Sequence, residues 1–118
     1  MNLLLVEDEP RVASFMTKGL RAQGHVVHWC DAGHPALEAL GDGRHWDLVL
    51  LDLGLPDIDG LDVLQRIRDS HNAVPVVVVT ARHDDAHCNR ASELGVHRYL
   101  TKPFTFTDLI DTLQPLLS

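Results

Sequence analysis

The sequence predicts one doubly wound α/β domain, in which five parallel strands alternate with five helices. Two features of the chain predict this class. Short runs of apolar residues recur along it, and each is followed by a segment in which apolar residues return every three or four positions. The chain has 118 residues, of which 45% are hydrophobic and 23% charged, as is typical of a single globular domain.

The apolar runs are the predicted strands. Four of them are uniformly apolar or nearly so, which is typical of strands that are buried on both faces of a parallel sheet. The fifth is shorter and more polar, as expected for a strand at the edge of the sheet. In chain order the predicted strands are Leu3–Val6, Val26–Cys30, Leu48–Leu51, Val76–Val79 and Val96–Leu100.

The segments between these runs predict helices, because a spacing of three or four residues puts apolar side chains on one helical face. Parallel neighbouring strands also require such crossover helices. The fourth predicted helix, within Asp84–Leu94, has the weakest periodicity. The apolar positions are, in chain order, Val12, Phe15, Met16 and Leu20; Pro35, Leu37 and Leu40; Leu61, Leu64 and Ile67; Ala91 and Leu94; and Phe106, Leu109, Ile110, Leu113 and Leu117.

Several helix ends are marked by residues with strong backbone preferences. Pro10 suits the first turn of the first helix, and Gly24 suits its end. The last helix opens with the pattern Thr105-x-x-Asp108, which resembles a capping box. Pro115 is expected to break that helix in its last turn, because proline lacks the N–H that a helix interior needs.

Charge and composition exclude several function classes. The net charge is −7, from 17 acidic and 10 basic residues, which argues against a chain-wide attraction to nucleic acid or to an anionic membrane. No apolar run approaches the roughly 18 residues of a membrane span, and the apolar start is too short for a signal peptide. The two cysteines, Cys30 and Cys88, are expected to be free thiols. We therefore expect a cytoplasmic protein without a membrane partner or direct nucleic-acid binding.

The residues that follow the predicted strands are the candidate site. Glu7 and Asp8 follow the first strand, Asp52 the third and Thr80 the fourth, and Lys102 comes just after the fifth. Ligands of open parallel sheets bind at the carboxyl ends of the strands, where these five residues would meet if the strand order brings those strands together. Three carboxylates in one crevice favour a cation, and ligation by oxygen alone suits Mg²⁺.

These five residues together fit a phosphoryl site. Mg²⁺ and the Lys102 ammonium would neutralise the phosphoryl charge, the Thr80 hydroxyl would donate to one of its oxygens, and Asp52 could act as the nucleophile. Any single acid at a strand end is more often a solvated cap, since helix N-termini also favour negative charge. Five residues of complementary types at corresponding strand ends are far less easily accidental.

The residues that carry these predictions resemble the receiver domain of bacterial two-component response regulators. The resemblance covers essentially the whole chain, and its segments together are specific to that family. It implies a (βα)5 flavodoxin-like, CheY-like fold with strand order 2-1-3-4-5, and one receiver domain over residues 1–118. The segments that carry it are Leu3–Glu9, Asp47–Pro56 with Asp59-Gly60, Thr80-Ala81-Arg82, and Tyr99–Phe104.

The resemblance also implies a ligand set for the metal. By position, Asp52 resembles the phosphoacceptor and Asp8 the direct Mg²⁺ ligand. Glu7 resembles the second acid, which acts through water, and the backbone carbonyl of Gly54 would complete the protein ligands.

Three further positions match residues that respond to the phosphoryl group. Thr80 resembles the switch hydroxyl, Lys102 its ion-pairing partner, and Tyr99 the switch aromatic, which turns inward when Thr80 moves. The Lys102–Pro103 bond is similar to the cis peptide of the family.

The function implied is a phospho-switch rather than an enzyme. A sensor histidine kinase would phosphorylate Asp52, and the surface of the fourth helix, fifth strand and fifth helix would change and act on an output domain or a separate output protein. Where many members have Ala-Asp-Asp, this chain has Val96-His97-Arg98, and no Lys or Arg follows Lys102. The charged dimer face of the DNA-binding members is therefore expected to be missing, which leaves a monomer or a dimer through another face.

Three other interpretations fit the sequence less well. A Mg²⁺-dependent phosphatase or phosphotransferase of the haloacid-dehalogenase type needs Asp-x-Asp after the first strand, which Glu7-Asp8-Glu9 does not provide. A degenerate receiver that only binds partners is disfavoured by the intact acidic set with Thr80 and Lys102. His83 and His87, spaced i,i+4 beside Cys88, could form a transition-metal site, but a polar helix face is the simpler explanation. Trp29 and Trp46 are expected to be packing residues.

Overall fold

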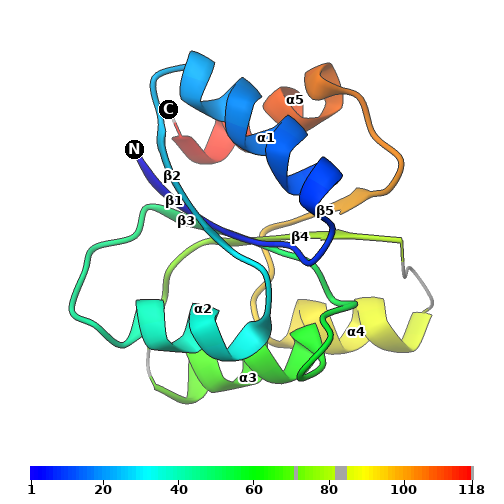
Figure 1. Ribbon diagram of the computed structural model, residues 1–118. Coiled ribbons are helices and arrows are strands. Elements are labelled where there is room, and N and C mark those ends of the chain that lie inside the picture. Colours follow the sequence, from blue (N-terminus) through cyan, green and yellow to red (C-terminus); the bar gives the residue numbers. More distant parts are fainter. Residues whose placement is uncertain (71, 82–84, 118) are drawn as a thin grey trace.

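In the computed structural model, one parallel sheet lies between two layers of helices (Figure 1). The structure describes residues 1–70, 72–81 and 85–117, without the side chains of residues 85–88. The strand order is β2-β1-β3-β4-β5 and every neighbouring pair is parallel, which confirms the predicted class and topology. None of the helices described is long and apolar enough to span a membrane.

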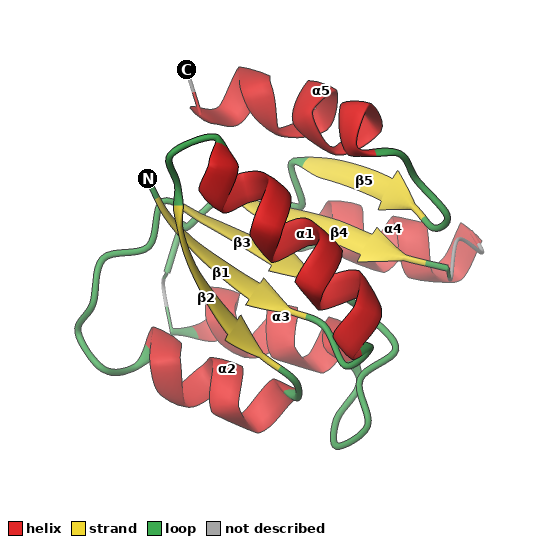
Figure 2. Ribbon diagram, turned by 45° about the horizontal axis from the view of Figure 1, so that its top comes forward, coloured by secondary structure: helices red, strands yellow, loops and turns green. Residues whose placement is uncertain are grey.

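The elements alternate along the chain as predicted, and Figure 2 shows the five strands running in the same direction. The strands are β1 (Asn2–Val6), β2 (Val26–Cys30), β3 (Leu48–Leu51), β4 (Val76–Thr80) and β5 (Arg98–Thr101). The helices are α1 (Pro10–Ala22), α2 (Gly33–Leu40), α3 (Gly60–Asp69), α4 (Asp85–Glu93) and α5 (Phe106–Leu117). Helices α1 and α5 cover one face of the sheet, and α2, α3 and α4 cover the other (Figure 1).

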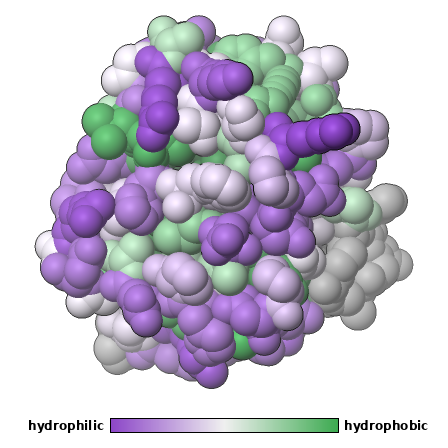
Figure 3. Space-filling model, viewed as in Figure 1, coloured by the Kyte–Doolittle hydropathy of each residue, from purple (hydrophilic) through white to green (hydrophobic). Residues whose placement is uncertain are grey.

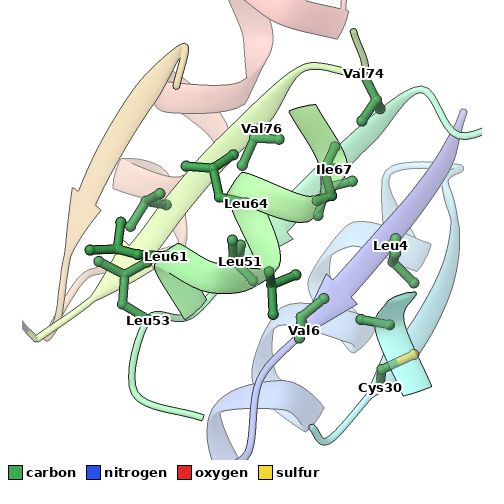
Figure 4. Close-up of a cluster of buried hydrophobic side chains, with 14 of the residues drawn as sticks. Leu4, Val6, Cys30, Leu51, Leu53, Leu61, Leu64, Ile67, Val74 and Val76 are labelled. Atoms are coloured by element: carbon green, nitrogen blue, oxygen red, sulfur yellow. The ribbon is translucent and has the colours of Figure 1, made fainter. Parts of the chain in front are cut away.

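The two faces of the sheet form two separate hydrophobic cores. Successive side chains of β1 point to opposite faces, so Leu4 and Val6 join the core under α2 and α3 while Leu3 and Leu5 join the core under α1 and α5. All four are at most 1% exposed. Figure 4 shows the first core, in which α3 packs against the central strands through residues such as Leu64. Burial on both faces explains why the central strands are continuously apolar.

The prediction that Val26–Cys30 is buried on both faces is wrong. This strand is β2, at the edge of the sheet, and within it only Val27 and Cys30 are buried. Val26 is 64% exposed and Trp29 is 43% exposed. Trp29 is therefore not the packing residue that we expected, whereas Trp46 is, at 7% exposure. On the face shown in Figure 3, hydrophobic areas are small and interspersed with polar ones.

Two helix ends that the sequence marks with glycine are closed by Schellman motifs. At the end of α1, Gly24 has φ +91° and the next N–H, from His25, donates to the Leu20 carbonyl. After α4, Gly95 has φ +77° and the Val96 N–H donates to the Ala91 carbonyl. The second motif explains why β5 begins at Arg98 rather than at the predicted Val96.

The last helix differs from the prediction in one respect. The capping box is confirmed, because the Thr105 N–H donates to Asp108 Oδ2 at 3.0 Å and the Asp108 N–H donates to Thr105 Oγ1 at 3.1 Å. Pro115, however, does not break α5, which continues to Leu117. The fixed φ of proline is compatible with helical backbone, and so close to the helix end little more than one hydrogen bond is lost.

One side chain of the first helix lies outside the core that we predicted for it. Phe15 is 39% exposed, and its ring makes edge contacts with Phe104 and Phe106 at centroid distances of 6.1 Å. The buried face of α1 consists instead of Ala13, Met16 and Leu20.

The loop between β3 and α3 is tied to the start of α2 by Asp57. Helix α2 has Ala32 at its N-cap position, with no side-chain cap of its own. Asp57 Oδ1 accepts from the Gly33 N–H and Oδ2 from the His34 N–H, both at 2.8 Å. Partial desolvation raises the pKa of Asp57, but hydrogen bonds from the N–H groups of His34, Gly33 and Ile58 outweigh it and lower this pKa to about 2.

We expect Asp57→Asn, which replaces one of the two accepting oxygens by an NH₂ group, to lower the free energy of unfolding at pH 7 by about 1 kcal/mol, the usual net contribution of one hydrogen bond. The folded pKa of about 2 lies below the ordinary value of 3.8, so the stabilisation is present above pH 4 and is lost as the pH falls through 2. Urea unfolding at several pH values would measure the difference in free energy of unfolding between the wild type and Asp57→Asn, which is the gap that should close at low pH. Asp111→Asn, at an exposed acid of α5, is the matched control, and a gap that persists unchanged at pH 2 would contradict the assignment.

Candidate functional site

The five candidate residues come from the carboxyl ends of four adjacent strands. Glu7 and Asp8 follow β1, Asp52 follows β3, Thr80 is the last residue of β4, and Lys102 follows β5. Because β1, β3, β4 and β5 are consecutive in the sheet, these ends lie side by side (Figure 2). The parallel topology therefore brings together residues that are almost 100 positions apart in the sequence.

Three carboxylates meet at this edge. One oxygen from each of Glu7, Asp8 and Asp52 lies within 4.8 Å of the other two. Glu7 is 1% exposed and Asp52 is 6% exposed, while Asp8 is half-buried. Among the described residues this is the one group of three or more acids, histidines or cysteines with such spacing. Burial of negative charges at this distance is unfavourable unless a cation or a proton offsets it.

Lys102 supplies part of that compensation. Its Nζ forms an ion pair with Glu7 Oε1 and lies 3.2 Å from Asp52 Oδ2. Burial alone would lower the pKa of Lys102, but the carboxylates of Glu7 and Asp52 raise it above its ordinary value. The ammonium is therefore retained at neutral pH, in contact with both acids.

The two buried acids differ in their affinity for a proton. Burial, together with the neighbouring Asp52, raises the pKa of Glu7 to about 8. Burial acts in the same direction on Asp52, but hydrogen bonds from Glu7, the Gly54 N–H and Lys102 outweigh it and lower the pKa of Asp52. Within this coupled pair, a proton is therefore held more readily by Glu7 than by Asp52, which is the more acidic member.

The backbone around Asp52 is held in place on both sides. Its N–H donates to the Val6 carbonyl at 2.9 Å, and its Oδ1 accepts from the Gly54 N–H at 3.1 Å. A Cβ on Gly60 would lie 2.5 Å from the Asp52 carbonyl oxygen, so only glycine allows α3 to start this close to the site. Asp59 caps that helix by accepting from the Leu61 N–H at 2.9 Å.

The donor set fits a hard divalent cation. All three clustered side chains offer carboxylate oxygens, which are the ligands that Mg²⁺ prefers, and no sulfur or imidazole donor belongs to the cluster. The arrangement thus places an ionised carboxylate, a cation and a pair of further acids around one crevice. Such a site can bind a metal ion and a phosphoryl group side by side.

The remaining predicted residues lie on β4, on β5 and directly after β5. Thr80 is 1% exposed, and its carbonyl accepts from the Lys102 N–H at 3.0 Å. Tyr99 is half-buried on β5, opposite Val78 of β4, on the face covered by α4. The Lys102–Pro103 peptide bond is cis. Arg82 and His83, and the side chains of His87 and Cys88, lie outside the described residues.

Sequence reasoning missed one residue that contacts the site. The Trp29 indole Nε1–H donates to the Glu7 carbonyl at 2.7 Å. The only signal in the sequence is that Trp29 stands near the end of β2, beside the strand from which Glu7 emerges. The neighbouring Cys30 is a buried free thiol, and burial and Asp31 raise its pKa to about 11.

Comparisons with known proteins agree with this geometry. A family model described as the response regulator receiver domain matches residues 3–114. The chain is 38% identical over 117 residues to the transcriptional regulatory protein CusR of Escherichia coli strain K12, covering 99% of this chain and 51% of CusR. It is 37% identical over 117 residues to the transcriptional activator protein IrlR of Burkholderia pseudomallei strain 1026b, covering 99% and 50%. The chain thus spans about half the length of these curated relatives.

Solved structures give the same result. The non-phosphorylated HemR receiver domain from Leptospira biflexa superimposes with a TM-score of 0.91 at 29% identity, covering 99% of this chain and 94% of that one. The response regulator protein TrrA from Thermotoga maritima, in complex with Mg²⁺ and BeF, matches with a TM-score of 0.85 at 28% identity, covering 98% of each chain. The chain therefore belongs to the response regulator receiver domains of two-component systems, and it is a signalling domain rather than an enzyme.

Proposed function

We propose that residues 1–118 form one receiver domain, a cytoplasmic phospho-switch that accepts a phosphoryl group on Asp52 from a sensor histidine kinase. The observation that supports this most directly is the contact of Lys102 with Asp52, beside the carboxylates of Glu7 and Asp8. Asp52 is the ionised member of the buried pair, and an ionised carboxylate is the form that acts as a nucleophile.

The transfer step uses groups that converge on Asp52. A carboxylate oxygen of Asp52 forms a bond to phosphorus while the bond from phosphorus to the kinase histidine nitrogen breaks, and its electron pair stays on the imidazole. The Lys102 ammonium pairs with a phosphoryl oxygen, and the Thr80 hydroxyl donates to another. Bound Mg²⁺ supplies the further positive charge that offsets the phosphoryl oxygens.

The proposed protein ligands of Mg²⁺ are all oxygen atoms of this chain. Asp8 and Asp52 would bind Mg²⁺ directly, together with the backbone carbonyl of Gly54. Glu7 would act through water, because its carboxyl is already paired with Lys102. Gly54 is exposed, and a Cβ added there would lie 3.9 Å from Asp52 Oδ1. Glycine at this position therefore leaves the outer side of the site open to the phosphodonor.

The output is a change of the surface formed by α4, β5 and α5. Thr80 and Tyr99 lie on the neighbouring strands β4 and β5, so a movement of Thr80 toward the phosphoryl group alters the packing against Tyr99. That surface would then act on an output domain or a separate output protein.

Acetyl phosphate with Mg²⁺ is expected to add one phosphoryl group to the protein, as measured by intact mass spectrometry. Asp52→Asn should abolish the adduct, because an amide is neither charged nor nucleophilic. Asp57→Asn, in the same loop but outside the crevice, is the matched control and should still be phosphorylated. An adduct that persists in the Asp52 variant would place the acceptor elsewhere.

Asp8→Asn should weaken Mg²⁺ binding more than Glu7→Gln does, because a direct ligand contributes more than a residue that acts through water. Isothermal titration with MgCl₂ at neutral pH would compare the two variants with the wild type. Equal affinity in all three proteins would rule out the proposed ligand set.

The phosphorylated domain is expected to stay monomeric at micromolar concentration, or to dimerise through a face other than α4-β5-α5. Helix α5 presents exposed Asp108 and Asp111 and carries no Lys or Arg, so two such helices would repel each other. Exposed Arg98 could offset part of this, but surface ion pairs contribute only about 0–1 kcal/mol. Sedimentation velocity with and without beryllofluoride would measure the state. A mimic-induced dimer that Arg98→Glu abolishes would show the opposite.

A further inference from the structure

The carbonyl of Glu7 lacks the usual ladder partner. In the register of β1 and β2, Val6 lies opposite Cys30, and the Glu7 N–H donates to the Cys30 carbonyl at 3.0 Å. The next donor in a parallel ladder would be the N–H of Ala32. Strand β2 ends at Cys30, however, and Ala32 is already the N-cap of α2. The indole N–H of Trp29 takes this place, at 2.7 Å from the Glu7 carbonyl oxygen.

This hydrogen bond fixes the peptide that joins the two acids of the site. The Glu7 carbonyl belongs to the same planar peptide unit as the Asp8 N–H and Cα, so its orientation sets the position of the atom from which the Asp8 side chain leaves the backbone. Glu7 is then held at its N–H by β2 and at its carbonyl by the indole. A shift of this peptide would displace Asp8 relative to Asp52, which belongs to a different strand.

Packing alone does not explain a tryptophan at this position. Trp29 is 43% exposed on an edge strand, whereas Trp46 is 7% exposed at the other end of the sheet, before β3 begins. Trp46 also uses its indole N–H, which donates to the Ala39 carbonyl at 3.2 Å. It precedes β3, at the opposite end of the strands from the acids. The two tryptophans therefore form a matched pair, one at the site and one away from it.

We propose that Trp29 is a positioning residue for the acidic site: its indole N–H holds the Glu7–Asp8 peptide in the orientation that binds a divalent cation. This inference rests on the proposed function, since it assumes that the three carboxylates bind Mg²⁺. Residues next to a metal's ligands that orient them commonly change metal affinity by about 10- to 100-fold when they are substituted.

The first test observes the hydrogen bond without altering the protein. The chain contains two tryptophans, so the ¹⁵N-labelled wild-type protein should give two indole N–H signals, assigned by Trp29→Phe and Trp46→Phe. Titration with MgCl₂ should shift the Trp29 signal along a saturable curve and leave the Trp46 signal in place. Movement of neither signal, or of the Trp46 signal alone, would contradict the proposal.

The second test measures affinity. Isothermal titration should show a Kd for Mg²⁺ that is about tenfold higher in Trp29→Phe and unchanged in Trp46→Phe. Benzothienylalanine at position 29, in which sulfur replaces the indole N–H, should weaken binding as phenylalanine does, because the bicyclic ring is kept and only the donor is lost. A benzothienylalanine protein with wild-type affinity would show that ring packing, not the hydrogen bond, matters.

The outcomes separate this inference from the function on which it rests. If the wild type binds Mg²⁺ and Asp8→Asn weakens binding while Trp29→Phe does not, the role of Trp29 is overturned and the site stands. If Trp29→Phe lowers the unfolding temperature equally with and without Mg²⁺, at unchanged Kd, the residue is merely structural and the inference also fails. If the wild type binds no Mg²⁺, the proposed site fails first.

Discussion

The central constraint on this structure is the electrostatic repulsion among three carboxylates at the carboxyl end of a parallel sheet. Glu7, Asp8 and Asp52 are within 4.8 Å of one another, and two of them are almost fully buried. Their mutual repulsion is offset by the ammonium of Lys102, and burial raises the pKa of Glu7, which favours its protonated form. Removal of that lysine would leave a buried negative charge without a partner, which costs far more than an exposed ion pair contributes. One ammonium does not balance all of these acids, so the cluster still favours a further cation.

Much of the fold follows from the sequence because its signals are local. A continuous apolar run such as Leu48–Leu51 needs burial on both faces, and the topology that provides it is a parallel sheet covered by helices. Glycines such as Gly24 end helices through their own backbone conformation. The two failures have different causes. Proline at position 115 satisfies the helical φ, which is a local effect, whereas β2 is less buried than its composition suggests because the topology puts it at the sheet edge.

The candidate site, like the fold, was predictable from the sequence in its main residues but not in the contacts that hold them. Residues that directly follow strands, such as Asp52, must lie at the carboxyl edge once the strands are parallel, and the strand order then brings them together. Trp29 and Asp57 were not predicted, since each acts through a contact with a segment more than twenty residues away. Such contacts depend on the exact pairing of strands and on loop shape, and no periodicity in the sequence encodes them.

The dependence of α2 on Asp57 has a consequence for the order in which the chain folds. An isolated helix of eight residues is unstable in water, and this one has no side-chain cap within its own segment. Its cap lies 24 residues away, in the loop that follows β3. In the folded structure that loop follows β3, which pairs with β1, so we expect α2 to gain its full helical structure only once this pairing has formed. Helix formation in α2 would therefore indicate that the central strands β1 and β3 have already paired.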